Sequence, residues 1–110
     1  MLIDWLIFRS FMFVGIGLLR IVIHQSSSLK QKRQVVKSIL GKVRSKFDVS
    51  IAEVGDNDKW QICSIGMAVV SNDSSHAHKM LETINEFIEN LYLAEVISFS
   101  IEISSFGEFH

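Results

Sequence analysis

Residues 28–47 read SLKQKRQVVKSILGKVRSKF, and the prediction of the fold starts from this segment. Its apolar residues recur at spacings of three, four and seven, which predicts an amphipathic helix with one buried face. They are Leu29, Val36, Ile39, Leu40, Val43 and Phe47. Ser28 followed by Gln31 has the spacing of a capping box, so we expect the helix to begin after Ser28 and to run to about Lys46.

Apolar runs before and after this helix predict strands. Met12–His24 is rich in Val, Ile, Leu and Phe and precedes the helix. Within it, Gly15 and Gly17 share one face, which permits the close approach of another backbone. Asp48–Val54 and Trp60–Ser71 flank the turn sequence GDND and therefore predict a hairpin.

A second helix and a last strand complete the chain. Ser74–Leu91 has an apolar stripe, and its exposed face is acidic through Glu82, Glu86 and Glu89. Ala94–Ser104 alternates apolar and polar residues, which predicts a strand buried on one face. The apolar side is expected to hold Ile97, Phe99, Ile101 and Ile103. Residues after Phe106 are expected to fray.

The order strand, helix, strand, strand, helix, strand predicts an α+β fold of the ferredoxin-like βαββαβ type. Four antiparallel strands would carry both helices on one face. The other sheet face would stay open and carry apolar residues, so we expect a homodimer through it. The single domain is assigned to residues 12–106, with an N-terminal extension at 1–11 and a tail at 107–110.

The first 23 residues are strongly apolar, but three charges interrupt the run: Asp4, Arg9 and Arg20. No uncharged span is long enough for a membrane helix, and no secretory cleavage site follows. Met12 is an alternative start of the domain. A membrane anchor made of the apolar residues before Met12 is the other interpretation of the extension. Cys63 is the only cysteine and lies in an apolar run, which indicates a buried thiol and a cytoplasmic setting.

Charge divides the chain into two halves, although its net charge is only −1. Residues 5–47 hold nine basic and no acidic side chains, whereas residues 48–110 hold eleven acidic and two basic ones. Such asymmetry indicates a polyanionic partner or a polarised self-association surface. Attraction between the two helices is the plainer explanation.

The cations of the first helix form a stripe beside its apolar face. On a helical wheel with Leu40 at zero, Arg33, Arg44, Lys37 and Lys30 fall at about +20° to +80°. The helix N-terminus at Ser28 adds free backbone N–H groups and a favourable dipole for an anion. The expected anion- or nucleic-acid-binding residues are therefore Ser28, Lys30, Lys32, Arg33, Lys37 and Arg44. An ordinary solvated helix face is the alternative.

Other polar groups give weaker signals. Glu53, Asp56 and Asp58 in the hairpin loop could hold a hard cation, although a turn needs such residues anyway. Trp60 is interpreted as a core or dimer-interface residue, or as a platform for a base. The histidines do not share a helix face, and no nucleotide-binding loop is present, so we expect no metal, cofactor or catalytic set.

From Met12 onward the chain resembles the YlxP-like family of bacterial proteins, a family of unknown function also termed DUF503. The resemblance rests on four stretches: SLKQKR with VVKS, FDVS with AEVG, WQ, and VSND. It implies a ferredoxin-like fold and, because genes of the family lie beside translation and ribosome-maturation genes, an RNA- or ribosome-associated role. It implies no catalytic residue. The chain departs from the family in its first eleven residues and at Asp56, where histidine is frequent.

The leading hypothesis is a non-enzymatic RNA- or ribosome-binding module. A homo-oligomeric protein-interaction or regulatory domain is the second hypothesis. The third is an enzyme for a phosphorylated or acyl-phosphate substrate, which lacks support because the loop at residues 25–28, QSSS, contains no arginine.

Overall fold

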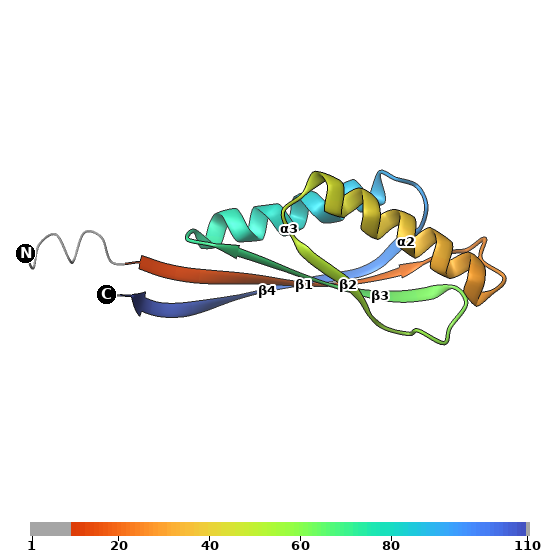
Figure 1. Cartoon of the computed structure of the whole chain (residues 1–110), viewed down its shortest axis with the longest axis horizontal. Helices are drawn as coiled ribbons and strands as arrows, with labels where there is room; N and C mark the ends of the chain where they lie inside the picture. Colours follow the sequence, from red (N-terminus) through yellow and green to blue (C-terminus); the bar gives the residue numbers. More distant parts are fainter. Residues whose placement is uncertain (1–9, 110) are drawn as a thin grey trace, which may run out of the picture.

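A computed structural model describes residues 10–109 of the chain. The elements are β1 (Ser10–Val22), α2 (Leu29–Lys46), β2 (Ser50–Gly55), β3 (Ile62–Ser71), α3 (Ser74–Glu89) and β4 (Glu95–Phe109). All neighbouring strands are antiparallel, in the order β2-β3-β1-β4. Both helices cover the same face of the sheet (Figure 1). The predicted ferredoxin-like α+β fold is confirmed.

The first helix begins where the capping sequence places it. The Ser28 side chain accepts a hydrogen bond from the Gln31 backbone N–H at 3.1 Å. The return bond goes one residue further back, because the Gln31 side chain accepts from the Ser27 backbone N–H at 2.7 Å. Together these bonds satisfy N–H groups that the first turn cannot pair internally.

The core lies between the helices and one sheet face, and β1 forms its centre. Leu19 and Ile21 of β1 are completely buried. Nearby, a methyl group added at Gly15 would lie 3.0 Å from Leu81 Cδ1 and 3.3 Å from Ala77 Cβ. The absence of side chains on this part of β1 therefore lets α3 pack close to the sheet, as the glycine pair predicts.

The last strand differs from expectation at Ile97, which is 45% exposed. The pairing steps from Arg20↔Ser98 to Ile21↔Val96, so Ile97 is an extra residue in a β-bulge. Val96 packs against the core in its place. The simple alternation expected from Ile97 onward holds only after the bulge.

The last strand is also longer than expected. β4 continues through Phe109, and its final pairs with β1 include Phe11↔Glu108. The tail expected to fray at 107–110 is therefore strand as far as Phe109. Ser10 and Phe11, assigned to the extension, belong to β1, while residues 1–9 and both interpretations of them lie outside the described residues. In Figure 1 the paired ends of β1 and β4 reach past α3 as a ribbon.

Within residues 10–109, neither helix is long and apolar enough to cross a membrane.

Replacing Gly15 by valine is expected to lower the free energy of unfolding by about 1–3 kcal/mol, because the added carbons must displace the buried Leu81. The matched control is Gly41→Ala in α2, where an added methyl meets nothing within 4 Å. This change should raise stability by about 0.5–1 kcal/mol through helix propensity. Urea unfolding measures the change in the free energy of unfolding for each variant. Changes of equal size and the same sign would contradict the close packing of α3 on the sheet.

Candidate functional site

Four cations lie along one exposed flank of α2: Lys30, Arg33, Lys37 and Arg44. The flank faces the β2 edge of the sheet, because the Arg44 guanidinium donates a 2.7 Å hydrogen bond to the Ile51 carbonyl of β2. The four residues are called the basic stripe below. Their exposure agrees with the helical wheel.

No acidic side chain neutralises the basic stripe among the residues that the structure describes. α2 itself contains no Asp or Glu. The ion pairs found within residues 10–109 involve other cationic groups. These are Arg20, His24, Lys32, Lys59 and His78. The stripe is therefore a concentrated positive surface with only solvent to balance it.

Lys32, expected among the anion-binding residues, is buried with 1% exposure. Its ammonium group donates to the Asp56 carbonyl at 2.5 Å and lies 3.2 Å from Glu53 Oε2. The expectation of a surface contact was wrong for this residue. On the helical wheel Lys32 lies at about −80°, between Val43 and Ile39 in the apolar face, and this angle was the available signal.

Glu53 links the buried lysine to the only cysteine. Cys63 is fully buried, and its thiol donates to Glu53 Oε2 at 3.3 Å. Burial, together with this hydrogen bond, raises the pKa of Cys63 to about 12. The thiol is thus protonated at neutral pH and is not a nucleophile. The predicted buried cysteine is confirmed.

Asp56 organises the hairpin loop through both carboxylate oxygens. One oxygen accepts from Ser64 Oγ at 2.7 Å and lies 3.3 Å from an Arg20 nitrogen, and the other lies 3.2 Å from Lys59 Nζ. The hydrogen bonds from Ser64 and Lys59 lower the pKa of Asp56 to about 2. Its backbone has φ 62°, a conformation that Asp tolerates better than most residues.

Two of the three carboxylates expected to hold a hard cation already have cationic protein partners, whereas the third, Asp58, is exposed. Glu53 meets Lys32, and Asp56 meets Arg20 and Lys59. Within the described part of the chain, no three His, Cys, Asp or Glu side chains are placed to hold a metal ion. The arrangement thus disfavours the hard-cation interpretation of this loop.

Trp60 is 58% exposed in the same loop, so it is not a core residue. Its neighbour Gln61 holds the loop to the β1–α2 connection by donating to the His24 and Ser26 carbonyls at 3.0 and 3.1 Å. Trp60 thus presents its ring beside a fixed segment, which suits the interface or base-platform interpretations.

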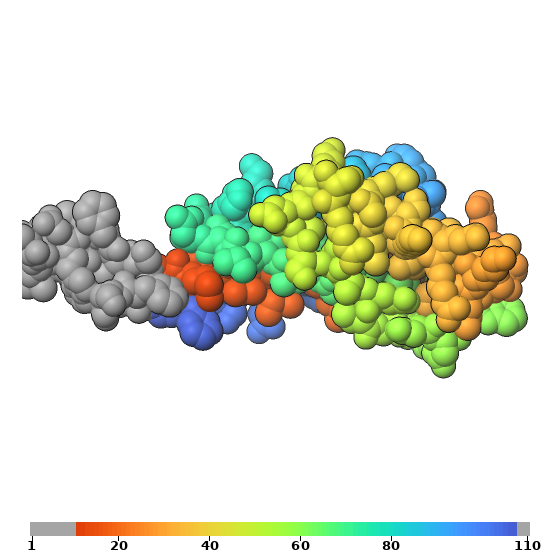
Figure 2. Space-filling model, in the orientation of Figure 1, coloured from red at the N-terminus to blue at the C-terminus, as the bar shows by residue number. Residues whose placement is uncertain are grey.

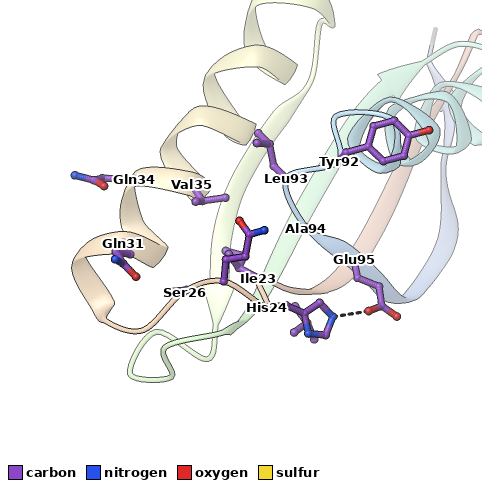
Figure 3. Close-up of a pocket in the computed structure, with 12 residues that line it drawn as sticks. Ile23, His24, Ser26, Gln31, Gln34, Val35, Tyr92, Leu93, Ala94 and Glu95 are labelled. Carbon is purple, nitrogen blue, oxygen red and sulfur yellow. Dashed lines mark hydrogen bonds and ion pairs between the residues drawn. The ribbon is translucent and has the colours of Figure 1, made fainter.

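A hollow of about 480 Å³ lies between the β1–α2 and α3–β4 connections (Figure 3). Val35 points from α2 toward it, and Ile23 and Leu93 line it. At its rim, His24 Nε2 and Glu95 Oε2 are 2.5 Å apart. Sequence reasoning missed this hollow because its two connections lie about 70 residues apart along the chain.

Two polar groups that line the hollow already have partners within the protein. Its histidine bonds to Glu95, and the Gln31 side-chain oxygen already accepts from Ser27. The basic stripe lies on the other flank of α2, so the structure does not bring hollow and stripe together. Ser28, expected to help bind an anion, is the helix cap and is only partly exposed.

Comparisons with known proteins agree with the sequence resemblance. Residues 14–101 match a family described as "Protein of unknown function (DUF503)". The "Uncharacterized protein YlxP" of Bacillus subtilis (strain 168) is 40% identical over 77 residues, covering 70% of this chain and 84% of that protein. A solved structure, "De novo designed protein Foldit4", has a TM-score of 0.45 at 16% identity and covers 86% of this chain and 97% of its own.

Replacing Lys32 by methionine is expected to lower the free energy of unfolding by about 2–3 kcal/mol, because Glu53 and the Asp56 carbonyl lose their buried donor. This expected loss of stability is smaller than the loss for a fully buried ion pair, because the Glu53 side chain is 22% exposed. Lys42→Met on the exposed side of α2 is the control and should change stability by less than about 0.5 kcal/mol. Equal urea midpoints for the two variants would show that the buried contacts contribute nothing.

Asp56→Asn tests the loop through pH. The carboxyl has a folded pKa of about 2 against an ordinary 3.8, so its ionised form stabilises the fold above pH 4. That contribution is lost as pH falls from about 4 to about 2, because the carboxyl becomes protonated. The urea midpoint of the wild-type chain should therefore exceed that of the variant at pH 6, and the gap should close toward pH 2. A gap that is independent of pH would contradict the assigned partners.

Proposed function

Because the chain belongs to the DUF503 family, whose description states no activity, we propose a function from its surface. The protein is a non-enzymatic binding module that holds RNA, ribosomal or other, against the basic stripe of α2. The observation that carries the proposal is the exposure of four cations in a row without an acidic partner in residues 10–109.

The spacing of the stripe suits a chain of phosphates. Lys30 and Arg44, its outer members, are separated by about 21 Å along the helix axis. In Figure 2, α2 in orange and yellow forms a continuous part of the visible surface above the green β2–β3 region. A nucleic-acid backbone lying along this flank would meet cations repeatedly, and their binding would release condensed counterions.

Two other cations of α2 are less available. Lys46 Nζ lies 4.8 Å from the centre of the Phe87 ring, where it makes a cation–π contact with α3. Lys42 donates to Ser38 Oγ at 2.9 Å on another side of the helix. The stripe therefore differs from Lys42 and Lys46 in its position on the helix.

Features of the described residues favour binding over catalysis. The Cys63 thiol is buried and protonated, and the carboxylates of Glu53 and Asp56 are held by cations. The connection at residues 25–28 has no arginine to hold a substrate phosphate. These features leave an acyl-phosphate enzyme without a supporting site, and the cytoplasm is the compartment in which we expect the module to act.

Changing Lys30, Arg33 and Lys37 together to glutamine is expected to weaken binding to ribosomal RNA by about ten- to a hundredfold at low salt. Arg44 is left intact because it also bonds to β2. The slope of log affinity against log salt should become less steep by about 2, since each lost phosphate contact reduces the size of the slope by about 0.7 for a single strand. Filter binding measures both quantities.

The control for this test is Lys42→Gln with Lys79→Gln, which removes exposed charge away from the stripe. It should leave the slope nearly unchanged. No retention of ribosomal RNA by the wild-type chain at low salt would refute the proposal. If the triple variant and the control variant weaken RNA binding equally, the binding is unspecific charge attraction and does not involve the basic stripe.

The open sheet face favours a second candidate, a homo-oligomeric interaction domain. No described helix covers this face, which is the underside of the sheet in Figure 1. Large apolar side chains on it are strongly exposed: Ile16 44%, Leu18 45%, Val54 59%, Val70 67% and Phe106 62%. Their number on one face is typical of an interface between subunits.

Val70→Glu is expected to shift such a dimer toward monomer, because it places a charge in the apolar patch. Leu93→Glu, in the connection after α3, is the control and should leave association unchanged. Sedimentation equilibrium over a range of concentrations measures the shift. A wild-type chain that stays monomeric throughout contradicts this second candidate.

A further inference from the structure

The last strand offers an unprotected edge. In the described sheet β4 pairs with β1 alone, so one row of its backbone N–H and C=O groups has no strand partner. Between the shifts near its two ends, the pairing of Ser98–Phe106 with β1 is regular. Residues 95–109 contain no lysine and no proline, the residues that usually block an exposed edge.

The opposite edge of the sheet is different. β2 has only six residues, and Arg44 covers its Ile51 carbonyl. An added strand would therefore find a long regular template at β4 and a short, partly occupied one at β2.

A groove runs beside the free edge of β4 on the helix side. Its floor is formed by Phe99, Ile101 and Ile103, which α3 leaves partly exposed. Two hollows of about 420 and 600 Å³ make up the groove, and they adjoin because both are lined by His78 and Glu82.

The wall of this groove is mainly acidic. α3 contributes Glu82, Glu86 and Glu89, all exposed, to the two hollows. Lys79 and His78 lie near the N-terminal end of α3, and His78 Nδ1 is 3.1 Å from Glu82 Oε1. An apolar floor below carboxylates fits lysine or arginine, whose stems pack on apolar carbons while their charged ends reach the rim.

We propose that β4 accepts a basic, extended peptide segment of another protein as a fifth strand. Alternate residues of the segment are lysine or arginine and lie on the helix side, over Phe99 and Ile101 and against the α3 glutamates. The residues between them are small or β-branched and lie beside Ser98 and Ser100 on the other face. This surface is separate from the basic stripe, and the inference does not depend on RNA binding.

The same charges argue against a second copy of this chain as the occupant. A two-fold pairing of β4 with β4 would bring two acidic α3 walls toward each other, and like charges in contact are unfavourable. The acidic wall thus selects a basic segment and also hinders self-pairing.

The test uses a blocked synthetic peptide of alternating lysine and threonine, about eight residues or about 26 Å when extended. Two control peptides have the same length: one replaces lysine by glutamate, and one groups the same lysines and threonines into two blocks. Titrations of the whole protein are followed by NMR and by amide hydrogen exchange. We expect the alternating peptide alone to bind and to slow exchange at every second amide of residues 98–106, because only outward N–H groups gain partners.

Variants locate the binding. Glu82→Gln, Glu86→Gln and Glu89→Gln together should weaken peptide binding by about tenfold, as expected for three exposed ion pairs. Asp48→Asn with Asp58→Asn removes exposed acids elsewhere and should have no effect. The triple variant changes only exposed side chains, so an unchanged urea midpoint serves as an independent check on its folding.

Three results would overturn the inference. The first is equal binding of the alternating and block peptides, which would indicate charge attraction without a strand. The second is binding that leaves exchange at β4 unchanged. The third is slow exchange of alternate β4 amides in the peptide-free protein together with a dimer in sedimentation, which would make a second copy the occupant.

Discussion

A buried ammonium group fixes how α2 lies on the sheet. Lys32 projects from the middle of the apolar face of the helix and meets Glu53 of β2 and the Asp56 carbonyl of the hairpin loop. An apolar face alone tolerates small rotations and slides, whereas a buried charge has one acceptable position, since an unpaired ammonium in the core is costly. We infer that this contact sets the register of α2 on β2. The basic stripe faces the β2 edge as a consequence.

The sequence predicted the order and type of all six elements because each has a clear period or turn signal. The helix of residues 28–47 shows the reason: its spacing and its Ser28 cap are local properties, and both reappear in the structure. Family membership followed from short sequence motifs, and the burial of Cys63 followed from its place in an apolar run. These features need no knowledge of which distant segments meet.

The features that were missed depend on distant partners. The bulge at Ile97 arises from the pairing of β4 with β1, and the sequence of β4 alone does not predict it. The hollow of Figure 3 joins two connections that are remote in sequence. The burial of Lys32 has a local signal, because the helical wheel places this residue inside the apolar face, whereas its charge favours the surface. The charge asymmetry of the chain also appears in the fold: the cations of α2 lie toward the β2 edge of the sheet, and the carboxylates of α3 lie toward β4.

The place of β1 in the sheet has a consequence for synthesis of the chain. β1 is made first, yet it lies between β3 and β4 and is completed only by the last strand. During translation, the edge of β1 that pairs with β4 stays without a strand partner until residues 95–109 have left the ribosome. The β2–β3 hairpin is the one strand pair that can close locally. Folding is therefore dominated by contacts between distant segments, which slows it relative to helical domains of the same size. A nascent chain stalled before residue 95 would expose the centre of its own sheet.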